Sequence, residues 1–350
     1  MTHPVDVAVC ASSTWPHLNP VFTGLCDWLA AHGYRYRHLA SHQELLGNTA
    51  LLQDVQVVVG YGSMPVNAHF MQAAPKLRGV VSCVSGTEGI DLETATQRGV
   101  LVAHACTSEN FRGMAESAML LMLHLVHDLD GTREAMRRDL PRAHPLRAQS
   151  LVGKTVGLVG WGRIAAMTAE LLRGWGVQVL VYSRRGAPVD LPAHARSVQL
   201  DELMAGSDVV CVLAGAEAGA PPIVGRAQLS RMKPSAYFMN LSRGSTVDEL
   251  AVAEALQAGR MAGAALDVFA IEPLPKDSPL WHCPNLILTP HRVGHTREAD
   301  ESLIPAAIAN VHALLQGRLP GMIRNPQVVQ AWLHRWQDQP AITFQETHQA

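Results

Sequence analysis

Short apolar runs alternate with amphipathic stretches along the first part of the chain. Runs rich in β-branched residues, such as VDVAVC (5–10) and VQVVVGYG (55–62), have the composition of buried strands. Between them, FTGLCDWLAAHG (22–33) repeats its apolar positions at the spacing of a helix that packs on one face. A second series of the same kind begins at Lys154 and runs to about Pro290. Strands that alternate with helices predict parallel sheets, and hence an α/β fold.

Two further helical stretches lie between and after these series. The stretch at 112–129, RGMAESAMLLMLHLVHDL, is apolar on nearly every face, which predicts a helix buried between layers. After Pro290 an apolar pattern at helical spacing extends to Gly317 and predicts a helix that returns to the first domain. The segment beyond it contains Trp332 and Trp336. It is either a docked tail or a contact with another subunit, and the sequence leaves both interpretations open.

Composition and charge exclude several classes of protein. Of the 350 residues, 48% are hydrophobic and 17% are charged, so the chain can bury enough apolar surface to fold. The formal net charge of -2 argues against nucleic acid or a membrane surface as the main partner. No basic segment followed by an apolar run opens the chain, and no run approaches ~18 apolar residues, which predicts a cytoplasmic protein. The six cysteines form no CxxC pair, which favours buried reduced thiols over a metal site or disulfides.

A glycine-rich turn stands between the first strand and the first helix of the second series. The run TVGLV (155–159) precedes it, and a second strand, VQVLVYS (177–183), follows the helix. In a dinucleotide-binding fold the first glycine makes the tight turn, the second lets the backbone approach the pyrophosphate, and the third position, here Ala165, allows close helix packing. The turn consists of Gly160, Trp161, Gly162, Arg163 and Ile164. We predict that it binds a dinucleotide; the alternative is a glycine turn with a structural role only.

The residues that end the second strand predict which dinucleotide binds. An NAD site has Asp or Glu there to hold the ribose 2′-hydroxyl, whereas a 2′-phosphate favours arginine and repels a carboxylate. Here Ser183 is followed by Arg184 and Arg185, and no acid occurs before Asp190. We therefore predict that NADP(H) is preferred, with NAD still possible. In the alternative, both arginines point to solvent.

Three strand-like runs late in the second series end in residues that suit one reaction. The first ends at Arg243, the second near Glu272 and the third at His291. Because parallel strands place their carboxyl ends at one edge of a sheet, we expect these side chains to face one cleft. Hydride transfer between a nicotinamide and a 2-hydroxy acid needs a cation to grip the carboxylate and an acid/base for the hydroxyl proton. A carboxylate beside the histidine favours the imidazolium. Taken singly, each residue also fits a purely structural role: Arg243 a surface salt bridge, Glu272 a loop acid and His291 a helix cap.

Several segments, in this order, resemble those of a known family. They are SGTEGID (85–91), NFRGMAES (110–117), VGLVGWGRIA (156–165), MNLSRGSTVDE (239–249), AGAALDVFAIEPLP (262–275) and LILTPHRVGHT (286–296). Over about residues 50–330 the chain thus resembles the D-isomer-specific 2-hydroxyacid dehydrogenases. That family includes glyoxylate/hydroxypyruvate reductases and 3-phosphoglycerate dehydrogenases. The D configuration of the product is implied by the resemblance alone.

The resemblance also implies a role for individual residues. Arg243 would bind and polarise the substrate, His291 would be the acid/base, and Glu272 would be the carboxylate partner of His291. Further implied contacts are with the cofactor from Leu241, Ser242 and Asp267, the last at the nicotinamide carboxamide, and with the substrate carboxylate from the backbone amides of Ser85 and Gly86.

The implied architecture is two Rossmann-like parallel-sheet domains, with the nucleotide-binding domain inserted into a flavodoxin-like substrate-binding domain. On this chain the substrate-binding domain would comprise residues 1–105 and 291–330, the dinucleotide-binding domain residues 106–290, and a C-terminal tail residues 331–350. Family members are usually dimers, which implies a homodimer.

Two stretches depart from the family pattern. Arg292 follows His291 directly and His295 precedes Thr296, where small or aliphatic residues are common. Arg292 either recognises an extra anionic group on the substrate, or points outward or pairs with an acid. The run AGAEAGA (214–220) replaces a loop usually rich in Leu, Thr and Pro, so the adenine side of the site stays undetermined.

The sequence thus favours an NADP(H)-preferring reductase of a small 2-oxo acid such as glyoxylate or hydroxypyruvate, with no metal. One alternative is a dehydrogenase of the same fold for 3-phosphoglycerate or phosphite, for which Arg292 is the nearby candidate for an extra cation. Another is a nicotinamide-sensing corepressor or binding module. The set of Arg, Glu and His does not exclude it.

Overall fold

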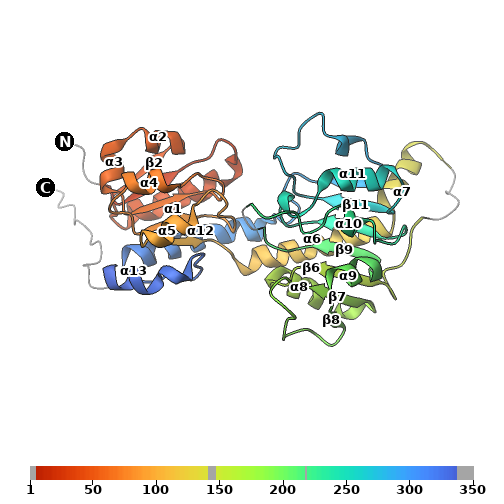
Figure 1. Ribbon diagram of the computed structural model, residues 1–350. Coiled ribbons are helices and arrows are strands. Elements are labelled where there is room, and N and C mark those ends of the chain that lie inside the picture. The colour runs from red at the N-terminus through yellow and green to blue at the C-terminus, as the bar shows by residue number, and fades with distance from the viewer. Residues whose placement is uncertain (1–4, 141–146, 217–218, 337–350) are drawn as a thin grey trace. The chain divides into compact units, whose positions relative to one another are not determined.

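The computed structural model describes residues 5–140, 147–216 and 219–336 (Figure 1). The chain divides into two compact units, of which the first runs to Glu109 and resumes at Arg297, and the second comprises Asn110–Thr296. The chain therefore enters the second unit and later returns to the first, a few residues beyond the expected boundaries at 105 and 290. Of the expected C-terminal tail, residues 337–350 lie outside the described residues. No helix in the described ranges is long and apolar enough to cross a bilayer.

The first unit is built on a parallel sheet of five strands in the order β2-β1-β3-β4-β5. The strands are β1 (Val7–Cys10), β2 (Tyr36–Leu39), β3 (Val57–Gly60), β4 (Gly79–Ser82) and β5 (Leu101–His104). The α-helices are α1 (Asn19–Ala31), α2 (His42–Leu46), α3 (Thr49–Asp54), α4 (Ala68–Ala73), α5 (Leu92–Gln97), α12 (Arg297–Leu315) and α13 (Val329–Trp336). Strands β1, β3, β4 and β5 are buried along their whole length, as expected when helices cover both faces of a parallel sheet. The strand order is that of flavodoxin-like folds.

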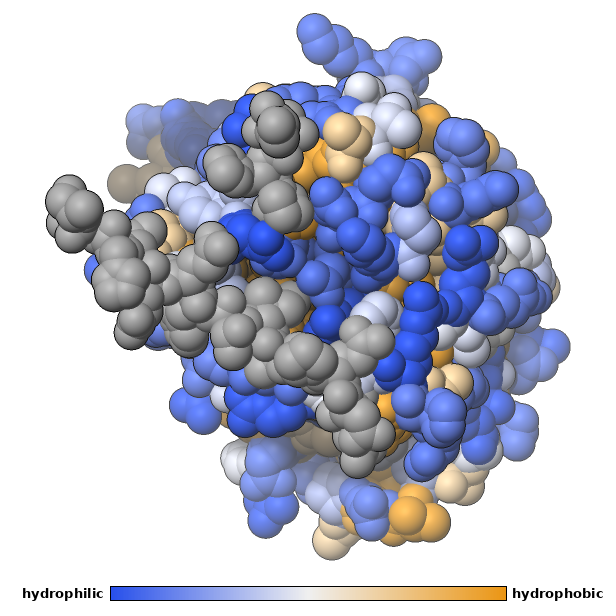
Figure 2. Space-filling model, turned by 90° about the vertical axis from the view of Figure 1, so that its left-hand side faces the viewer, coloured by the Kyte–Doolittle hydropathy of each residue, from blue (hydrophilic) through white to orange (hydrophobic). Residues whose placement is uncertain are grey.

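Helices α12 and α13 complete the first unit within the described residues. A Cβ on Gly79 of β4 would stand 2.6 Å from Cδ1 of Leu314 of α12, so the Leu314 side chain packs directly on the strand backbone. Trp332 and Trp336 of α13 are buried, and the Trp332 indole N–H donates to the Arg78 carbonyl at 2.8 Å. Of the two interpretations of this segment, docking therefore holds for α13. The side of the first unit that faces the viewer in Figure 2 is mostly hydrophilic, with apolar side chains in small separate areas.

The second unit is built on a parallel sheet of seven strands in the order β12-β11-β10-β9-β6-β7-β8. The strands are β6 (Thr155–Val159), β7 (Gln178–Tyr182), β8 (Ala195–Ser197), β9 (Val209–Val212), β10 (Tyr237–Asn240), β11 (Gly263–Leu266) and β12 (Leu286–Leu288). The α-helices are α6 (Ser108–Val126), α7 (Leu129–Arg137), α8 (Arg163–Leu172), α9 (Leu200–Gly206), α10 (Arg226–Leu229) and α11 (Glu249–Gln257). The order reverses between β6 and β9, and ligands of open parallel sheets bind at such a switch point. Two parallel-sheet α/β units confirm the predicted fold class.

Helix α6 corrects one prediction. Its sequence is apolar on nearly every face, which predicted burial between layers. The structure buries Ala115, Ala118 and Met122 but leaves the Leu120 side chain 58% exposed. Within the described part of this chain, only some of the apolar side chains of α6 are therefore buried.

The cysteines were predicted to be buried reduced thiols, and four of the six are buried. Cys10, Cys26, Cys83 and Cys211 are buried, and Cys106 and Cys283 are half-buried. Burial raises the pKa of the Cys83 and Cys211 thiols to about 12, so these groups stay protonated and serve as core side chains.

Candidate active site

The glycine turn after β6 has the geometry of a phosphate-binding loop. Gly160 has φ of +105°, and a Cβ there would stand 2.5 Å from the Ala214 backbone, so only glycine fits. Gly162 caps the N-terminus of α8, no described side chain caps that end of the helix, and no described atom lies within 4 Å of where its Cβ would stand. A helix N-terminus of this kind is a common binding position for an anion. These residues fit a dinucleotide pyrophosphate.

The other residues of the turn lie around this helix end. Ala165 is buried and allows α8 to pack closely on the sheet, whereas Trp161 and Ile164 are half-buried. The exposed Arg163 places its guanidinium carbon 5.2 Å from the centre of the Phe111 ring, a cation–π contact with α6.

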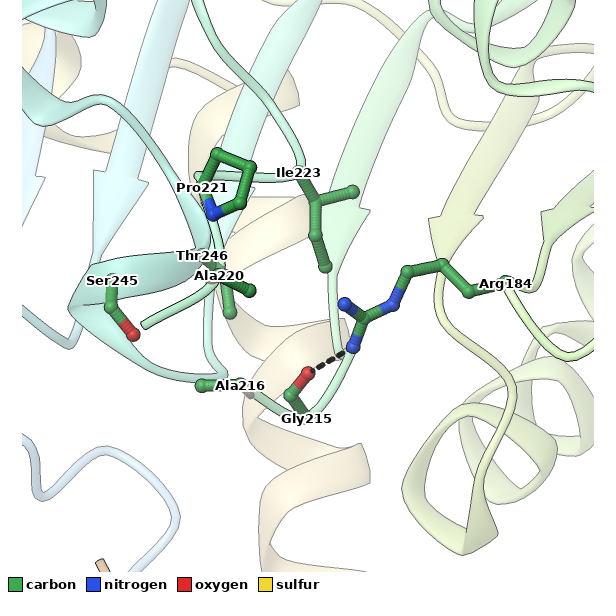
Figure 3. A pocket seen from close by; sticks show the side chains of 8 residues that line it. All are labelled: Arg184, Gly215, Ala216, Ala220, Pro221, Ile223, Ser245 and Thr246. Carbon is green, nitrogen blue, oxygen red and sulfur yellow. Dashed lines mark hydrogen bonds between the residues drawn. The ribbon is translucent and has the colours of Figure 1, made fainter. Parts of the chain in front are cut away.

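The two arginines after β7 lie at the same edge of the sheet. Arg184 donates from Nη2 to the Gly215 carbonyl at 2.9 Å, which joins the ends of β7 and β9 across the switch point (Figure 3). The small pocket beside this bond is lined by Arg184, Gly215, Ala216, Ala220, Pro221, Ile223, Ser245 and Thr246. Arg185 is exposed, and its backbone N–H donates to the Ser183 hydroxyl at 3.3 Å. Glu217 and Ala218, in the unusual run after β9, lie outside the described residues.

His291 and Glu272 form the central pair of the site. Nδ1 of His291 is 2.8 Å from Oε2 of Glu272, while Oε1 of Glu272 accepts the Phe269 N–H at 3.0 Å. Burial raises the pKa of the Glu272 carboxyl, but these hydrogen bonds and the charges of His291 and Arg243 outweigh it and hold the pKa below its ordinary value. Glu272 is therefore a carboxylate at neutral pH. A carboxylate accepts hydrogen bonds, so the Nδ1–H donates to Glu272, and the role predicted for His291 as the acid/base remains a prediction.

Asp267 holds the turn that carries His291. Its Oδ1 accepts the Thr289 hydroxyl at 2.7 Å and the backbone N–H groups of Arg292 at 3.0 Å and Val293 at 3.2 Å. Burial of this carboxyl, which is 1% exposed, raises its pKa, and the three hydrogen bonds and the charge of His291 oppose that rise. The predicted contact with the nicotinamide carboxamide remains a prediction.

Arg243 follows β10 and is held by a buried polar network. The Asn240 side chain donates to the Arg243 carbonyl at 3.1 Å, and the Thr246 hydroxyl donates to the same carbonyl at 2.6 Å. The guanidinium Nη1 donates to the Ser242 carbonyl at 2.8 Å. A Cβ on Gly244 would overlap the Phe269 backbone, so the Arg243 turn lies directly against the segment that leads to Glu272.

The parallel sheet brings together most of the predicted site residues. The glycine turn, Arg184, Arg243, Glu272 and His291 all follow strands of the second unit and lie at the same edge of its sheet. Leu241 and Ser242 are buried, and the Ser242 hydroxyl bonds Asn240 and Thr246, so their predicted cofactor contacts remain predictions.

Ser85 and Gly86 belong to the first unit, in the loop after β4. The Ser82 hydroxyl donates to the Gly86 carbonyl at 2.7 Å, and a Cβ on Gly62 would stand 2.8 Å from the Gly86 backbone. This loop is therefore fixed by the Ser82 hydroxyl and by close packing against the Gly62 backbone. Its predicted contact with a substrate carboxylate remains a prediction.

One of the two departures from the family pattern, Arg292 with His295, lies directly after His291. Arg292 is exposed and His295 is half-buried, and the His295 N–H donates to the Arg292 carbonyl at 3.0 Å.

The comparisons with known proteins agree with this geometry. The family model "D-isomer specific 2-hydroxyacid dehydrogenase, NAD binding domain" matches residues 119–292. Glyoxylate/hydroxypyruvate reductase B of Pectobacterium carotovorum is 33% identical over 293 residues, which cover 79% of this chain and 88% of that protein. The chain belongs to the D-isomer-specific 2-hydroxyacid dehydrogenase family. It is thus an oxidoreductase that acts on CH–OH groups with a nicotinamide cofactor, as predicted.

Two further members of this 2-hydroxyacid dehydrogenase family show its range. The NADPH-dependent glyoxylate/hydroxypyruvate reductase of Sinorhizobium meliloti superposes with a TM-score of 0.76 at 26% identity, over 91% of this chain and 97% of that one. D-3-phosphoglycerate dehydrogenase of Mycobacterium leprae is 32% identical over 275 residues, 77% of this chain but only 51% of that protein.

Proposed function

We propose that this 2-hydroxyacid dehydrogenase is an NADP(H)-preferring reductase of small 2-oxo acids such as glyoxylate or hydroxypyruvate, with a D-configured product where the product is chiral. The observation that carries the proposal is the His291–Glu272 pair, with the charge of Arg243 acting on Glu272, at the sheet edge that holds the phosphate-binding turn. The Pectobacterium and Sinorhizobium relatives, both named as glyoxylate/hydroxypyruvate reductases, support the substrate class.

His291 supplies the proton in this proposal. Its Nδ1 is engaged by the Glu272 carboxylate, so Nε2 gives its proton to the substrate carbonyl oxygen in the direction of reduction. The Glu272 carboxylate, 2.8 Å from Nδ1, orients the ring for this step. In the reverse direction the neutral imidazole accepts the hydroxyl proton.

Arg243 binds and orients the acid. A guanidinium can donate two parallel N–H bonds to the substrate carboxylate and carbonyl, and its charge stabilises the negative charge that develops on the carbonyl oxygen. The backbone amides of Ser85 and Gly86 would receive the carboxylate from the first unit. The bound nicotinamide supplies or accepts the hydride, and Asp267 would hold its carboxamide.

The preference for NADP(H) rests on Arg184 and Arg185. Both follow β7 and are exposed, and the first acid after them in the sequence is Asp190. The Arg184 guanidinium already lies across the switch point, bonded to the Gly215 carbonyl. A 2′-phosphate would add a charge-assisted hydrogen bond there, and the end of β7 carries no carboxylate to repel it.

A substrate and cofactor panel tests this proposal directly. The loss of absorbance of NADPH or NADH is followed with glyoxylate, hydroxypyruvate and larger 2-oxo acids. We expect kcat/KM to be highest with NADPH and the two small acids. In Arg184→Ala, the KM for NADPH should rise by about tenfold, the effect of one charge-assisted hydrogen bond, while the KM for NADH stays the same.

The matched control is Arg260→Ala, which removes an exposed arginine beyond the C-terminus of α11 in the same unit. It should leave both KM values unchanged. A wild-type enzyme that favours NADH contradicts the proposed cofactor preference, and no turnover of any 2-oxo acid contradicts the proposed reaction.

Phosphorylated acids are the second candidate substrates. Arg292 is exposed one residue beyond His291, and the Mycobacterium leprae relative is named as a 3-phosphoglycerate dehydrogenase. If the phosphorylated 2-oxo acid exceeds hydroxypyruvate in kcat/KM, and Arg292→Ala abolishes only that advantage, the substrate class shifts to phosphorylated acids.

We also propose a homodimer formed through the second unit. Leu120 of α6 and Met136 of α7 are 58% and 84% exposed, and Leu129 and Leu140 nearby in the chain are also exposed. Exposed apolar side chains on adjoining elements are typical of an interface between subunits. Light scattering should give twice the mass of one chain.

A further inference from the structure

The His291 turn has a backbone conformation that needs support. His291 has φ of +55°, in the left-handed region that residues with a Cβ seldom adopt. Such a conformation persists only where surrounding contacts determine it. The contacts of this turn therefore decide where the imidazole ring is held.

One side of the turn is held by Asp267, through the hydrogen bonds that reach Thr289, Arg292 and Val293. These bonds fix the hydroxyl and N–H groups on either side of His291. They do not reach the Val293 carbonyl, which belongs to the next peptide unit and is held by another element.

That element is α6. The Ser117 hydroxyl is 2.6 Å from the Val293 carbonyl oxygen and 2.8 Å from the Gly113 carbonyl oxygen in the preceding turn of its own helix. Ser117 is 6% exposed, so water does not compete strongly for this contact. Val293 thus has its N–H bonded to Asp267 and its carbonyl bonded to Ser117.

Close backbone packing makes this contact possible. A Cβ on Gly113 would stand 2.6 Å from the Gly294 carbonyl oxygen, and a Cβ on Gly294 would overlap the Met114 side chain. Gly113 and Ser117 are four residues apart and therefore share one face of α6. Two small residues on that face allow the turn to lie against the helix.

We propose that Ser117 is a positioning residue for His291. Its hydroxyl holds the Val293 carbonyl and so fixes the turn from the helix side, while Asp267 fixes it from the sheet side. Together they keep the imidazole at its distance from Glu272. This role rests on the proposed function of His291 as the acid/base.

Ser117→Ala tests the role, and Ser207→Ala is its matched control. Ser207 follows α9, is fully buried and also donates to the carbonyl four residues before it, Leu203, at 2.7 Å. Among the described residues its hydroxyl has no contact with the His291 turn. Both variants lose one buried hydroxyl, but only Ser117→Ala releases the Val293 carbonyl.

The expected result is a change confined to the chemical step. Ser117→Ala should lower kcat by about tenfold, the effect of one lost hydrogen bond, with the KM for NADPH unchanged. Ser117→Thr, which keeps the hydroxyl, should recover most of the lost kcat. Ser207→Ala should lower the melting temperature without lowering kcat.

The proposal is overturned if Ser117→Ala lowers kcat no more than Ser207→Ala does, or if the KM for NADPH rises in parallel with the loss of kcat. His291→Ala, measured beside them, separates the two hypotheses. If His291→Ala keeps its turnover, the proposed acid/base is wrong; if it is inactive while Ser117→Ala behaves like the control, only the positioning role is wrong.

Discussion

The two units have the same kind of sheet but differ in the residues at the carboxyl ends of their strands. In the first unit, the loops after β3 and β4 pack backbone against backbone, as Gly62 does on Gly86. In the second unit, the corresponding edge carries Arg243, Glu272 and His291, each fixed by hydrogen bonds. The first edge offers a rigid surface of backbone groups and the second offers groups that carry charge and protons. Chemistry on this fold therefore depends on the residues at the strand ends, not on the sheet.

The largest expected effect concerns the proton-transferring group of the second unit. His291→Ala should lower kcat by about 10²- to 10⁴-fold, the usual contribution of a general acid/base, because no imidazole remains to protonate the carbonyl oxygen. NADPH binding, measured by fluorescence titration, should change little. His127→Ala, at an exposed histidine just after α6, is the matched control and should keep full activity. Substantial turnover by His291→Ala would contradict the proposal that the proton-transferring group lies at the sheet edge of the second unit.

An intermediate effect is expected from the glycine contact of the first unit. Gly62→Ala places a Cβ 2.8 Å from the Gly86 backbone, so the two loops must separate. Overpacking of this kind costs about 1–3 kcal/mol in free energy of unfolding, which urea denaturation measures. The KM for the oxo acid should also rise, because the Ser85–Gly86 amides would move.

Gly321→Ala is the control for that variant, because no described atom lies within 4 Å of where its Cβ would stand. It should leave both the free energy of unfolding and the KM unchanged. If Gly62→Ala lowers kcat as much as His291→Ala does, the first unit contributes to the chemical step and does not only supply a surface of backbone groups.

The smallest effect concerns how stability depends on pH. The pKa of Glu272 in the folded protein lies below its ordinary value of 4.5, so near that pH the unfolded chain binds more protons at this group. The resulting stabilisation is fully present above pH 4.5 and is lost as the pH falls through the folded pKa. Glu272→Gln should therefore flatten the dependence of the urea midpoint on pH in acid. The control is Glu202→Gln, at an exposed residue. If both variants give the same slope of urea midpoint against pH, Glu272 contributes nothing to the pH dependence of stability.

Much of the fold could be predicted because it depends on local patterns. Short β-branched runs that alternate with amphipathic stretches predicted the parallel sheets, and Gly160 of the phosphate-binding turn is dictated by the positive φ that the turn needs. The convergence of Arg243, Glu272 and His291 could be predicted from the parallel strand direction alone.

The supporting contacts could not be predicted because they join residues distant in sequence. The bond from Ser117 to Val293 spans 176 positions, and Asp267 bonds Val293 over 26 positions. Asn240 gave one available hint, a polar residue at the end of the buried run YFMN. The burial predicted for α6 failed at Leu120 because one sequence does not reveal whether an apolar face meets its own chain or another copy.

The division of the first unit between the two ends of the chain has a consequence for its biosynthesis. Strands β1, β3, β4 and β5 leave the ribosome early, yet Val57, Val81 and Leu101 share a core with Leu314 and Trp332 from α12 and α13. At roughly 5–20 residues per second, the intervening second unit delays those helices by about ten seconds or more. During that interval this face of the nascent sheet is covered by α1 but not yet by α12 and α13. Helices α12 and α13 thus determine when strands β1, β3, β4 and β5 are fully protected from aggregation.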